Sequence, residues 1–126
     1  MIKGINHITF VVKDLERTAT FLEEIFEAKE VYSSLTVKYF LLNDLWVALN
    51  KGEPLSQPTY NHIAFTISDS DFDKYIQRIK SVGAEIKQGR ARKPGEGQSI
   101  YFYDFDNNLF ELHTGSLLER LSQLPK

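Results

Sequence analysis

Two histidines and one glutamate are the side chains in this sequence whose types could together hold a metal ion. His7 lies in the pentapeptide 6–10, Asn-His-Ile-Thr-Phe, and His62 lies in the closely similar pentapeptide 61–65, Asn-His-Ile-Ala-Phe. Glu111 stands between two apolar residues, where a carboxylate without a partner would be costly to bury. Two imidazoles and one carboxylate leave coordination positions open for substrate and water, and they suit Mn²⁺, Fe²⁺, Zn²⁺, Co²⁺ or Ni²⁺ without choosing among them.

Each member of this set also has an ordinary structural explanation. A single histidine is more often a core or surface residue than a ligand, but the chain has only three histidines. Two of them occupy equivalent positions of a repeat, which favours a shared site. Glu111 could instead pair with Arg120 or with a buried lysine. His113 shares the strand face of Glu111 and is the competing third ligand, ranked second because it lies nearer the end of the strand.

A second group of charges gathers in one predicted loop over residues 88–98 and the strand end before it. Four cations lie within seven residues there: Lys87, Arg90, Arg92 and Lys93. The tripeptide Gly-Glu-Gly follows them at 95–97. A solvated surface loop explains this composition as well as a clamp for a phosphate or phosphonate does. The sequence alone leaves both explanations open.

The repeat that carries the histidines indicates a duplicated βα module. In the first module, 4–50, we expect a strand over 4–12 that places His7 and Thr9 on one face, then a helix capped by Asp14. Three more strands are expected over 31–34, 37–42 and 45–49. The segment 51–58 is predicted to be a linker, because it contains a glycine, two prolines and polar residues.

The second module, 59–113, repeats this order. Its expected elements are a strand over 60–67, a helix from Ser70 that stops at Gly83, and strands over 84–87, 99–104 and 109–113. A short helix over 114–121 follows, with Ser116 and Glu119 at the spacing of a capping box. The chain is therefore predicted to be a single α+β domain over 1–126, built from two tandem βαβββ modules.

Composition excludes several classes of function. A formal charge of −2 with scattered lysines and arginines gives no basic surface for nucleic acid. The chain has no apolar run long enough to cross a bilayer and no apparent signal peptide, so the expected location is the cytoplasm. The absence of cysteine removes thiolate ligands and a thiol nucleophile on the protein. Any metal must therefore be held by nitrogen and oxygen.

The chain resembles the fosfomycin-resistance enzymes of the vicinal oxygen chelate superfamily over about residues 1–121. The segments that carry the resemblance, besides the duplicated pattern of His7, His62 and Glu111, are 4–9, 60–65, 99–102 and 110–115. Further agreement comes from the Leu45-Trp46 strand, the Gly-Glu-Gly loop and the segment 115–121. The resemblance implies the vicinal oxygen chelate fold, a paired-module homodimer, and a metal-dependent enzyme, with Mn²⁺ as the leading metal, that opens the epoxide of a small phosphonate antibiotic.

The same resemblance assigns roles to individual residues. His7 of one subunit is expected to meet His62 and Glu111 of the other at the metal, and Thr9 is expected beside the epoxide as a catalytic residue. The substrate-binding residues are then those that line the pocket or hold the phosphonate: Tyr39, Trp46, Arg92, Ser99, Tyr101 and Arg120. Arg92 is chosen from the loop cations although spacing alone does not assign it.

The nucleophile separates the branches of this family, which add glutathione, bacillithiol or cysteine, or water. The second half of the chain most resembles the water-adding branch, whereas the segment 33–39 is short and lacks the glutamate base of that branch. Asp44 is the nearest carboxylate. Thr9 stands where the bacillithiol branch commonly has cysteine. The breadth of the match favours hydration, while the missing base favours addition of a thiol, which needs less help at neutral pH.

Two alternatives of other kinds stay open at this point. A metal-free homodimer that sequesters a drug in its groove would use the same fold without catalysis. A related isomerase, lyase or dioxygenase would use the same three ligands. Trp46, the cationic Gly-Glu-Gly loop and Arg120 fit a small phosphonate better than an aromatic diol.

Overall fold

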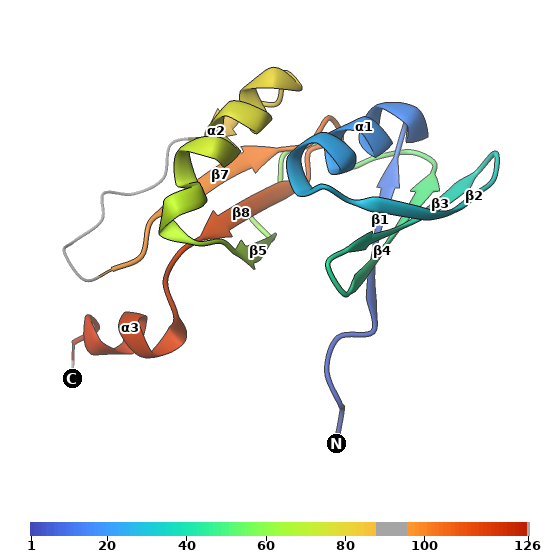
Figure 1. Cartoon of the computed structure of the whole chain (residues 1–126). Coiled ribbons are helices and arrows are strands. Elements are labelled where there is room, and N and C mark those ends of the chain that lie inside the picture. Colours follow the sequence, from blue (N-terminus) through green and yellow to red (C-terminus); the bar gives the residue numbers. More distant parts are fainter. Residues whose placement is uncertain (88–95, 126) are drawn as a thin grey trace.

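Two four-stranded sheets and the helices that cover them make up the molecule (Figure 1). The computed structural model describes residues 1–87 and 96–125. The first sheet contains β1 (His7–Val12), β2 (Lys29–Ser33), β3 (Val37–Leu42) and β4 (Leu45–Lys51). The second contains β5 (His62–Thr66), β6 (Ile86–Lys87), β7 (Ser99–Tyr103) and β8 (Leu109–His113). No helix in the described part of the chain is long and apolar enough to cross a membrane.

The two sheets have the same topology, which confirms the predicted pair of βαβββ modules. The strand orders are β1-β4-β3-β2 and β5-β8-β7-β6. In each sheet the first strand pairs in parallel with the last strand of its module, and the remaining pairs are antiparallel. Positions in one module therefore have register equivalents in the other.

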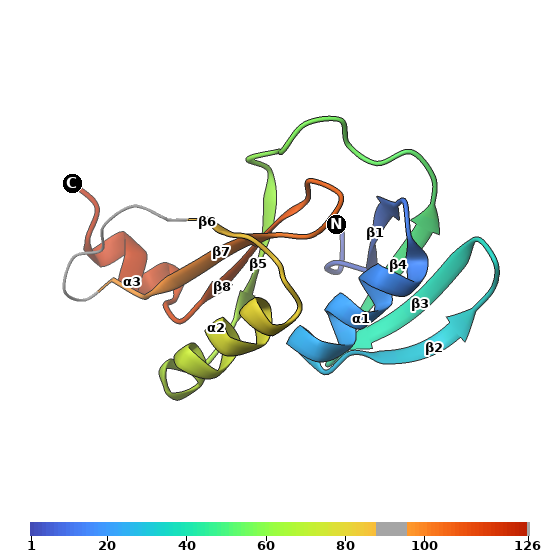
Figure 2. The same ribbon diagram turned by 90° about the horizontal axis from the view of Figure 1, so that it is seen from above.

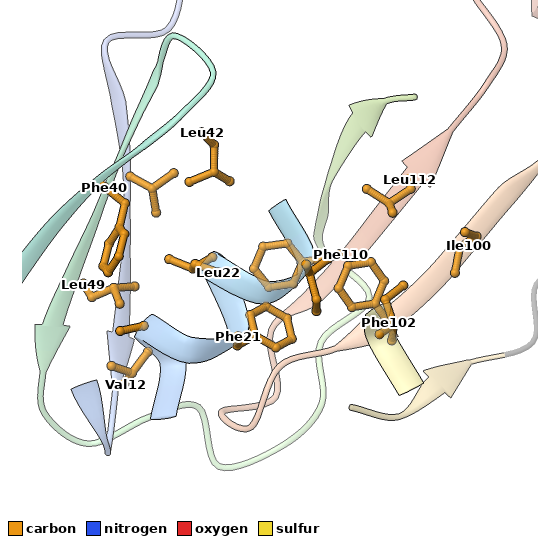
Figure 3. Packing of buried hydrophobic residues seen from close by; sticks show 14 of the residues in the cluster. Val12, Phe21, Leu22, Phe40, Leu42, Leu49, Ile100, Phe102, Phe110 and Leu112 are labelled. Carbon is orange, nitrogen blue, oxygen red and sulfur yellow. The ribbon is translucent and has the colours of Figure 1, made fainter. Parts of the chain in front are cut away.

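Helices α1 (Leu15–Phe26) and α2 (Phe72–Ser81) lie on the same side of the sheets (Figures 1 and 2). The Phe21 side chain on α1 is fully buried, and its ring centroid lies 5.9 Å from that of Phe102 and 5.6 Å from that of Phe110. Figure 3 shows Phe21 and Leu22 of α1 between side chains of the two sheets. One hydrophobic core therefore joins the two modules and leaves the opposite face of each sheet for other contacts.

The two helices begin differently. The Asp14 side chain accepts a hydrogen bond from the Arg17 backbone N–H at 3.1 Å, which confirms the predicted cap of α1. The prediction that Ser70 caps α2 is wrong. A 3₁₀ turn over Asp69–Asp71 precedes this helix and places Ser70 inside the turn, so α2 begins at Phe72 with no side-chain cap. The helix ends at Ser81, shortly before Gly83 with its positive φ of 77°.

The turn between β7 and β8 is built around the buried carboxyl of Asp104. It accepts hydrogen bonds from the backbone N–H groups of Asp106, at 2.8 Å, and Asn108, at 2.9 Å. Burial is the main cause that raises the pKa of Asp104 above its ordinary value. Asp106 in turn accepts a hydrogen bond from the Lys13 backbone N–H at 3.0 Å, so this turn also fastens the second module to the end of β1.

The last described element is α3 (Leu117–Ser122), which lies on the side of the sheets away from α1 and α2 (Figure 1). Ser116 is its N-cap and accepts a hydrogen bond from the Glu119 N–H at 3.2 Å, as the capping spacing predicts. The helix is shorter than the predicted 114–121 at its N-terminal end, because residues 114–116 are not helical and lead from β8 to the cap.

Candidate metal centre

The candidate ligands lie on the sheet faces that the helices leave uncovered. Along β1 the more buried positions alternate with exposed ones, and His7 and Thr9 are exposed. The same alternation along β5 exposes His62 and Ala64. Because side chains alternate across a strand, the two histidines occupy equivalent places on the two open faces.

Glu111 reaches the open face of the second sheet from the neighbouring strand. It pairs in register with Ala64 on one side and with Tyr101 on the other. Its side chain is almost buried, with a relative exposure of 7% for the residue, and its Oε1 atom lies 3.0 Å from His62 Nε2. The structure thus brings together two of the three predicted ligands.

Hydrogen bonds on the far nitrogen orient both imidazoles. His62 Nδ1 lies 2.7 Å from the carbonyl oxygen of Tyr60, and His7 Nδ1 lies 2.7 Å from the side-chain oxygen of Asn6. Since these oxygens only accept, Nδ1 carries the proton that it donates in each case. The Nε2 lone pair of each neutral ring then points away from this contact and can bind a metal, as in the histidine ligands of known metalloproteins.

The His62–Glu111 pair fits a metal ion. With Nδ1 as the donor, Nε2 of the neutral ring and the carboxylate Oε1 are both acceptors, and two acceptors 3.0 Å apart need a cation or a proton between them. Ligands bound at about 2.1 Å and at right angles around one ion are about 3 Å apart. At the observed spacing both atoms could therefore bind the same ion.

His7 is not part of this cluster within one chain. Its ring stacks on Trp46 with centroids 4.2 Å apart, and Tyr39 contacts Trp46 edge-on at 5.2 Å, all on the first sheet. Over residues 1–87 and 96–125, no group of three His, Asp, Glu or Cys side chains is close enough to hold a metal. The donor set of a single chain is thus incomplete, although each half has suitable geometry.

A groove of about 350 Å³ separates the edges of the two sheets. The residues that line it include Thr9 and Phe10 of β1, Asn61 and His62 at the start of β5, and Leu55 of the linker. Thr9, the predicted catalytic residue, therefore shares a cavity wall with a candidate ligand. The space is large enough for a few non-hydrogen atoms of a small ligand.

Glu111 has a second set of contacts on its other oxygen. Ser99 Oγ lies 2.6 Å from Oε2 of Glu111 and 2.7 Å from Nδ1 of His113. The alternative in which Glu111 pairs with Arg120 is not what the structure shows, because Arg120 forms an ion pair with Glu96 at 2.6 Å. Sequence reasoning did not identify these two contacts, because they depend on strand register and on side-chain conformation.

Of the other predicted site residues, those on the two sheets are Tyr39, Trp46, Ser99 and Tyr101, and Arg120 lies on α3. Tyr101 contacts the His62 ring edge-on with centroids 5.6 Å apart. Arg92 and most of the cationic loop lie outside the described residues. Asp44 is exposed in the two-residue turn between β3 and β4. The turn 34–36 between β2 and β3 contains no carboxylate, as the sequence shows.

Comparison with known proteins places this arrangement in context. The family model described as "Glyoxalase/Bleomycin resistance protein/Dioxygenase superfamily" matches residues 4–112. Fosfomycin resistance protein FosX from Listeria innocua is 55% identical over 133 aligned positions that cover the full length of both chains. Metallothiol transferase FosB from Staphylococcus haemolyticus is 45% identical, over 97% of this chain and 91% of its own.

Solved structures of FosX proteins have the same fold as this chain. FosX from Listeria monocytogenes, complexed with Mn(II) and sulfate, has a TM-score of 0.92 and 54% identity, with 98% of each chain covered. A glutamate-to-glutamine mutant of that protein, complexed with Mn(II) and 1S,2S-dihydroxypropylphosphonic acid, also has a TM-score of 0.92, at 53% identity, and covers 98% of each chain. The fold described above is therefore that of proteins crystallised with a divalent metal.

Proposed function

The chain belongs to the glyoxalase/bleomycin resistance protein/dioxygenase superfamily, and from that premise we propose that it is a metal-dependent fosfomycin resistance enzyme that adds water to the epoxide. The observation that carries the proposal is the approach of His62 Nε2 to Glu111 Oε1, 3.0 Å apart, in a chain similar to FosX over its full length. The proposal includes a cytoplasmic location, which fractionation of producing cells would test.

The metal would be held by His62 and Glu111 of one subunit and by His7 of a second subunit, with Mn²⁺ as the metal found with related structures. His62 and Glu111 are close enough to bind the same ion. His7 uses Nδ1 for its hydrogen bond to Asn6, which leaves Nε2 available to bind a metal. When bound, such an ion polarises the epoxide oxygen and stabilises the negative charge that develops as the ring opens. A homodimer is therefore part of the proposal, because one chain supplies only two of the three ligands at one place.

The open faces supply the substrate contacts. Tyr101 and Arg120 would hold the phosphonate together with Arg92 of the loop and Ser99. The ion pair to Glu96 engages one Arg120 nitrogen, and a guanidinium carries five N–H donors in all, so Arg120 can serve both partners. Trp46 and Tyr39 would line the apolar wall of the pocket. Thr9 faces the groove between the sheets and would hydrogen-bond the epoxide oxygen.

Addition of a thiol is the second candidate, and one observation favours it. The turn 34–36 is Ser-Leu-Thr and carries no general base, while Asp44 lies exposed in a different turn. Loss of a general base typically slows a proton-transfer step about 10²–10⁴-fold. A small thiol, with a pKa near 8.5, already supplies some thiolate at neutral pH. Similarity to FosB, a metallothiol transferase, is lower than similarity to FosX, so hydration ranks first.

Phosphorus NMR of fosfomycin mixtures tests these functions directly. The protein is incubated with Mn²⁺ and fosfomycin, first without thiol and then with glutathione, cysteine or bacillithiol in parallel. Hydration predicts the dihydroxypropylphosphonate signal in every mixture and its loss with chelator. A product that forms only with one thiol would replace the water mechanism, and protection in proportion to protein, unaffected by chelator, would show a drug-binding dimer instead.

A further inference from the structure

Ser99 stands between two side chains on the open face of the second sheet. Its hydroxyl oxygen is 2.6 Å from Glu111 Oε2 and 2.7 Å from His113 Nδ1, whereas His113 Nδ1 is 3.5 Å from the same carboxylate oxygen. The hydroxyl therefore bridges the imidazole and the carboxylate. Register pairing of Ser99 on β7 with His113 on β8 fixes this arrangement in the backbone.

The proton positions follow from what each group can donate. A carboxylate only accepts, so the single hydroxyl proton of Ser99 goes to Glu111. The lone pairs of the hydroxyl then accept from His113, whose Nδ1 must carry a proton. The result is a directional chain in which His113 donates to Ser99 and Ser99 donates to Glu111.

These hydrogen bonds give the two carboxylate oxygens of Glu111 different contacts. Oε2 is occupied by Ser99, and Oε1 is left facing His62 Nε2 at 3.0 Å. Metal-binding carboxylates are commonly held in this way by a hydrogen bond on the oxygen that does not bind the ion.

Two glycines leave the space that the His113 ring occupies. A Cβ added to Gly115 would lie 2.7 Å from His113 Nε2, and one added to Gly97 would clash with the Gly115 backbone nitrogen and lie 3.0 Å from His113 Cε1. Two hydrogen bonds between Gln98 and Thr114, at 2.9 Å and 3.0 Å, hold this backbone crossing together. The imidazole has room only because neither position carries a side chain.

We propose that Ser99 and His113 are positioning residues that orient Glu111 for the metal. The inference rests on the proposed function, because it assigns Glu111 to the metal. A residue that served only to bind the phosphonate would leave metal binding without substrate unchanged. Removing the Ser99 hydroxyl should therefore weaken metal binding in the absence of substrate.

The test measures Mn²⁺ affinity by electron paramagnetic resonance, without substrate, in the full-length protein. Ser99→Ala should raise the Mn²⁺ dissociation constant roughly 10–100-fold, the usual cost of losing such a partner, and Ser99→Thr should restore it. Asn50→Ala is the matched control, because Asn50 is exposed and occupies in the first sheet the register position of His113 in the second. It should leave the affinity unchanged.

Two more variants test whether His113 acts on Glu111 through Ser99. The loss in Ser99→Ala/His113→Ala should equal that in Ser99→Ala alone, since the second deletion removes a contact already broken. Gly115→Ala, checked for folding by circular dichroism, should weaken Mn²⁺ binding as His113→Ala does. Additive losses would contradict the chain of hydrogen bonds.

The outcomes separate this inference from the proposed function. Unchanged Mn²⁺ affinity in Ser99→Ala, with a raised Michaelis constant at saturating Mn²⁺, would overturn the inference and make Ser99 a phosphonate ligand, with the enzyme assignment intact. Failure of the wild-type protein to bind Mn²⁺ at all would contradict the proposed function, and the inference with it.

Discussion

The open face of the first sheet and that of the second occupy equivalent registers but carry different chemistry. Across β1, β4 and β3 one row reads Thr9, Ala48, Tyr39. Across β5, β8 and β7 the equivalent row reads Ala64, Glu111, Tyr101. The duplicated backbone therefore keeps a tyrosine in the same place and exchanges the residues on the two strands beside it.

The rows that hold the histidines differ in the same way. His7 lies beside Trp46, and His62 lies beside Leu109. The first face thus has an imidazole stacked on an aromatic ring, and the second has an imidazole next to a carboxylate. Among the described residues neither face gathers three candidate ligands, so the repeat accounts for the two imidazoles but not for Glu111.

The largest expected effect comes from removing the one carboxylate that distinguishes the faces. Glu111→Gln should lower fosfomycin turnover roughly 10³-fold or more, because a Lewis acid supplies several kcal/mol of transition-state stabilisation that a weaker ligand set would forfeit. Ala48→Ser, at the equivalent position of the first sheet, is the control. Turnover by phosphorus NMR and Mn²⁺ binding should fall together in the first variant and persist in the second.

The equivalent tyrosines give a smaller contrast. Tyr101→Phe should raise the Michaelis constant for fosfomycin about 10–100-fold, the usual range for a lost hydrogen bond to a charged group. Tyr39→Phe should change it less than about threefold, because Phe keeps the ring contact with Trp46 that the structure shows at 5.2 Å. Steady-state kinetics at saturating Mn²⁺ measure both. Equal effects would mean that the two faces contact the phosphonate alike.

The helix starts provide a comparison outside the site. Asp14→Ala should lower the free energy of unfolding by about 1 kcal/mol, because it removes the side-chain cap of α1. Ser70→Ala should change it by less than about 0.5 kcal/mol, because α2 has no side-chain cap to lose. Urea denaturation measures both. A larger loss in the Ser70 variant would mean that the 3₁₀ turn is assigned wrongly.

The smallest effect concerns the turns that precede the last strand of each module. The first module uses Asn43-Asp44, with Asn43 at φ 54°, whereas the second uses a turn around buried Asp104. The pKa of Asp104 is raised by burial, so the folded state binds its proton more tightly than the unfolded state. Its contribution to stability is therefore full below the ordinary pKa of 3.8 and is lost as pH rises through the folded pKa.

Asp104→Asn should remove this part of the pH dependence. The difference in unfolding free energy, wild type minus variant, should fall as pH rises from about 3.8 through the folded pKa and then level off. Asp44→Asn in the exposed turn serves as the control and should show no such trend. Urea titrations at a series of acidic pH values give the comparison.

Much of the fold followed from local signals in the sequence. The structure gives β3 the predicted bounds of 37–42, and Asp14 caps α1 as its type and position predict. The start of α2 was not predictable in this way. Ser70 is a good capping residue by type, but the chain enters the helix through a 3₁₀ turn that contains Ser70.

The candidate site was likewise only partly predictable from the sequence. Residue chemistry singled out His62 and Glu111, which the structure places 3.0 Å apart, because an imidazole repeated at equivalent positions and an acid on an apolar strand are visible in the sequence. The bridge from His113 through Ser99 and the pair of Arg120 with Glu96 were missed. Both depend on strand register and on side-chain conformation, which no local pattern specifies.

The central claim is that complementary faces of two different subunits make one metal site. Mixing His7→Ala with Glu111→Ala after joint unfolding and refolding tests it most directly. Each variant alone should be nearly inactive. Heterodimers should regain one intact site, built from His7 of the Glu111→Ala chain and the His62–Glu111 pair of the His7→Ala chain. Random mixing of a symmetric dimer then predicts about a quarter of wild-type fosfomycin turnover. No recovery, with heterodimers confirmed by native mass spectrometry, would contradict the claim and place all three ligands within one chain.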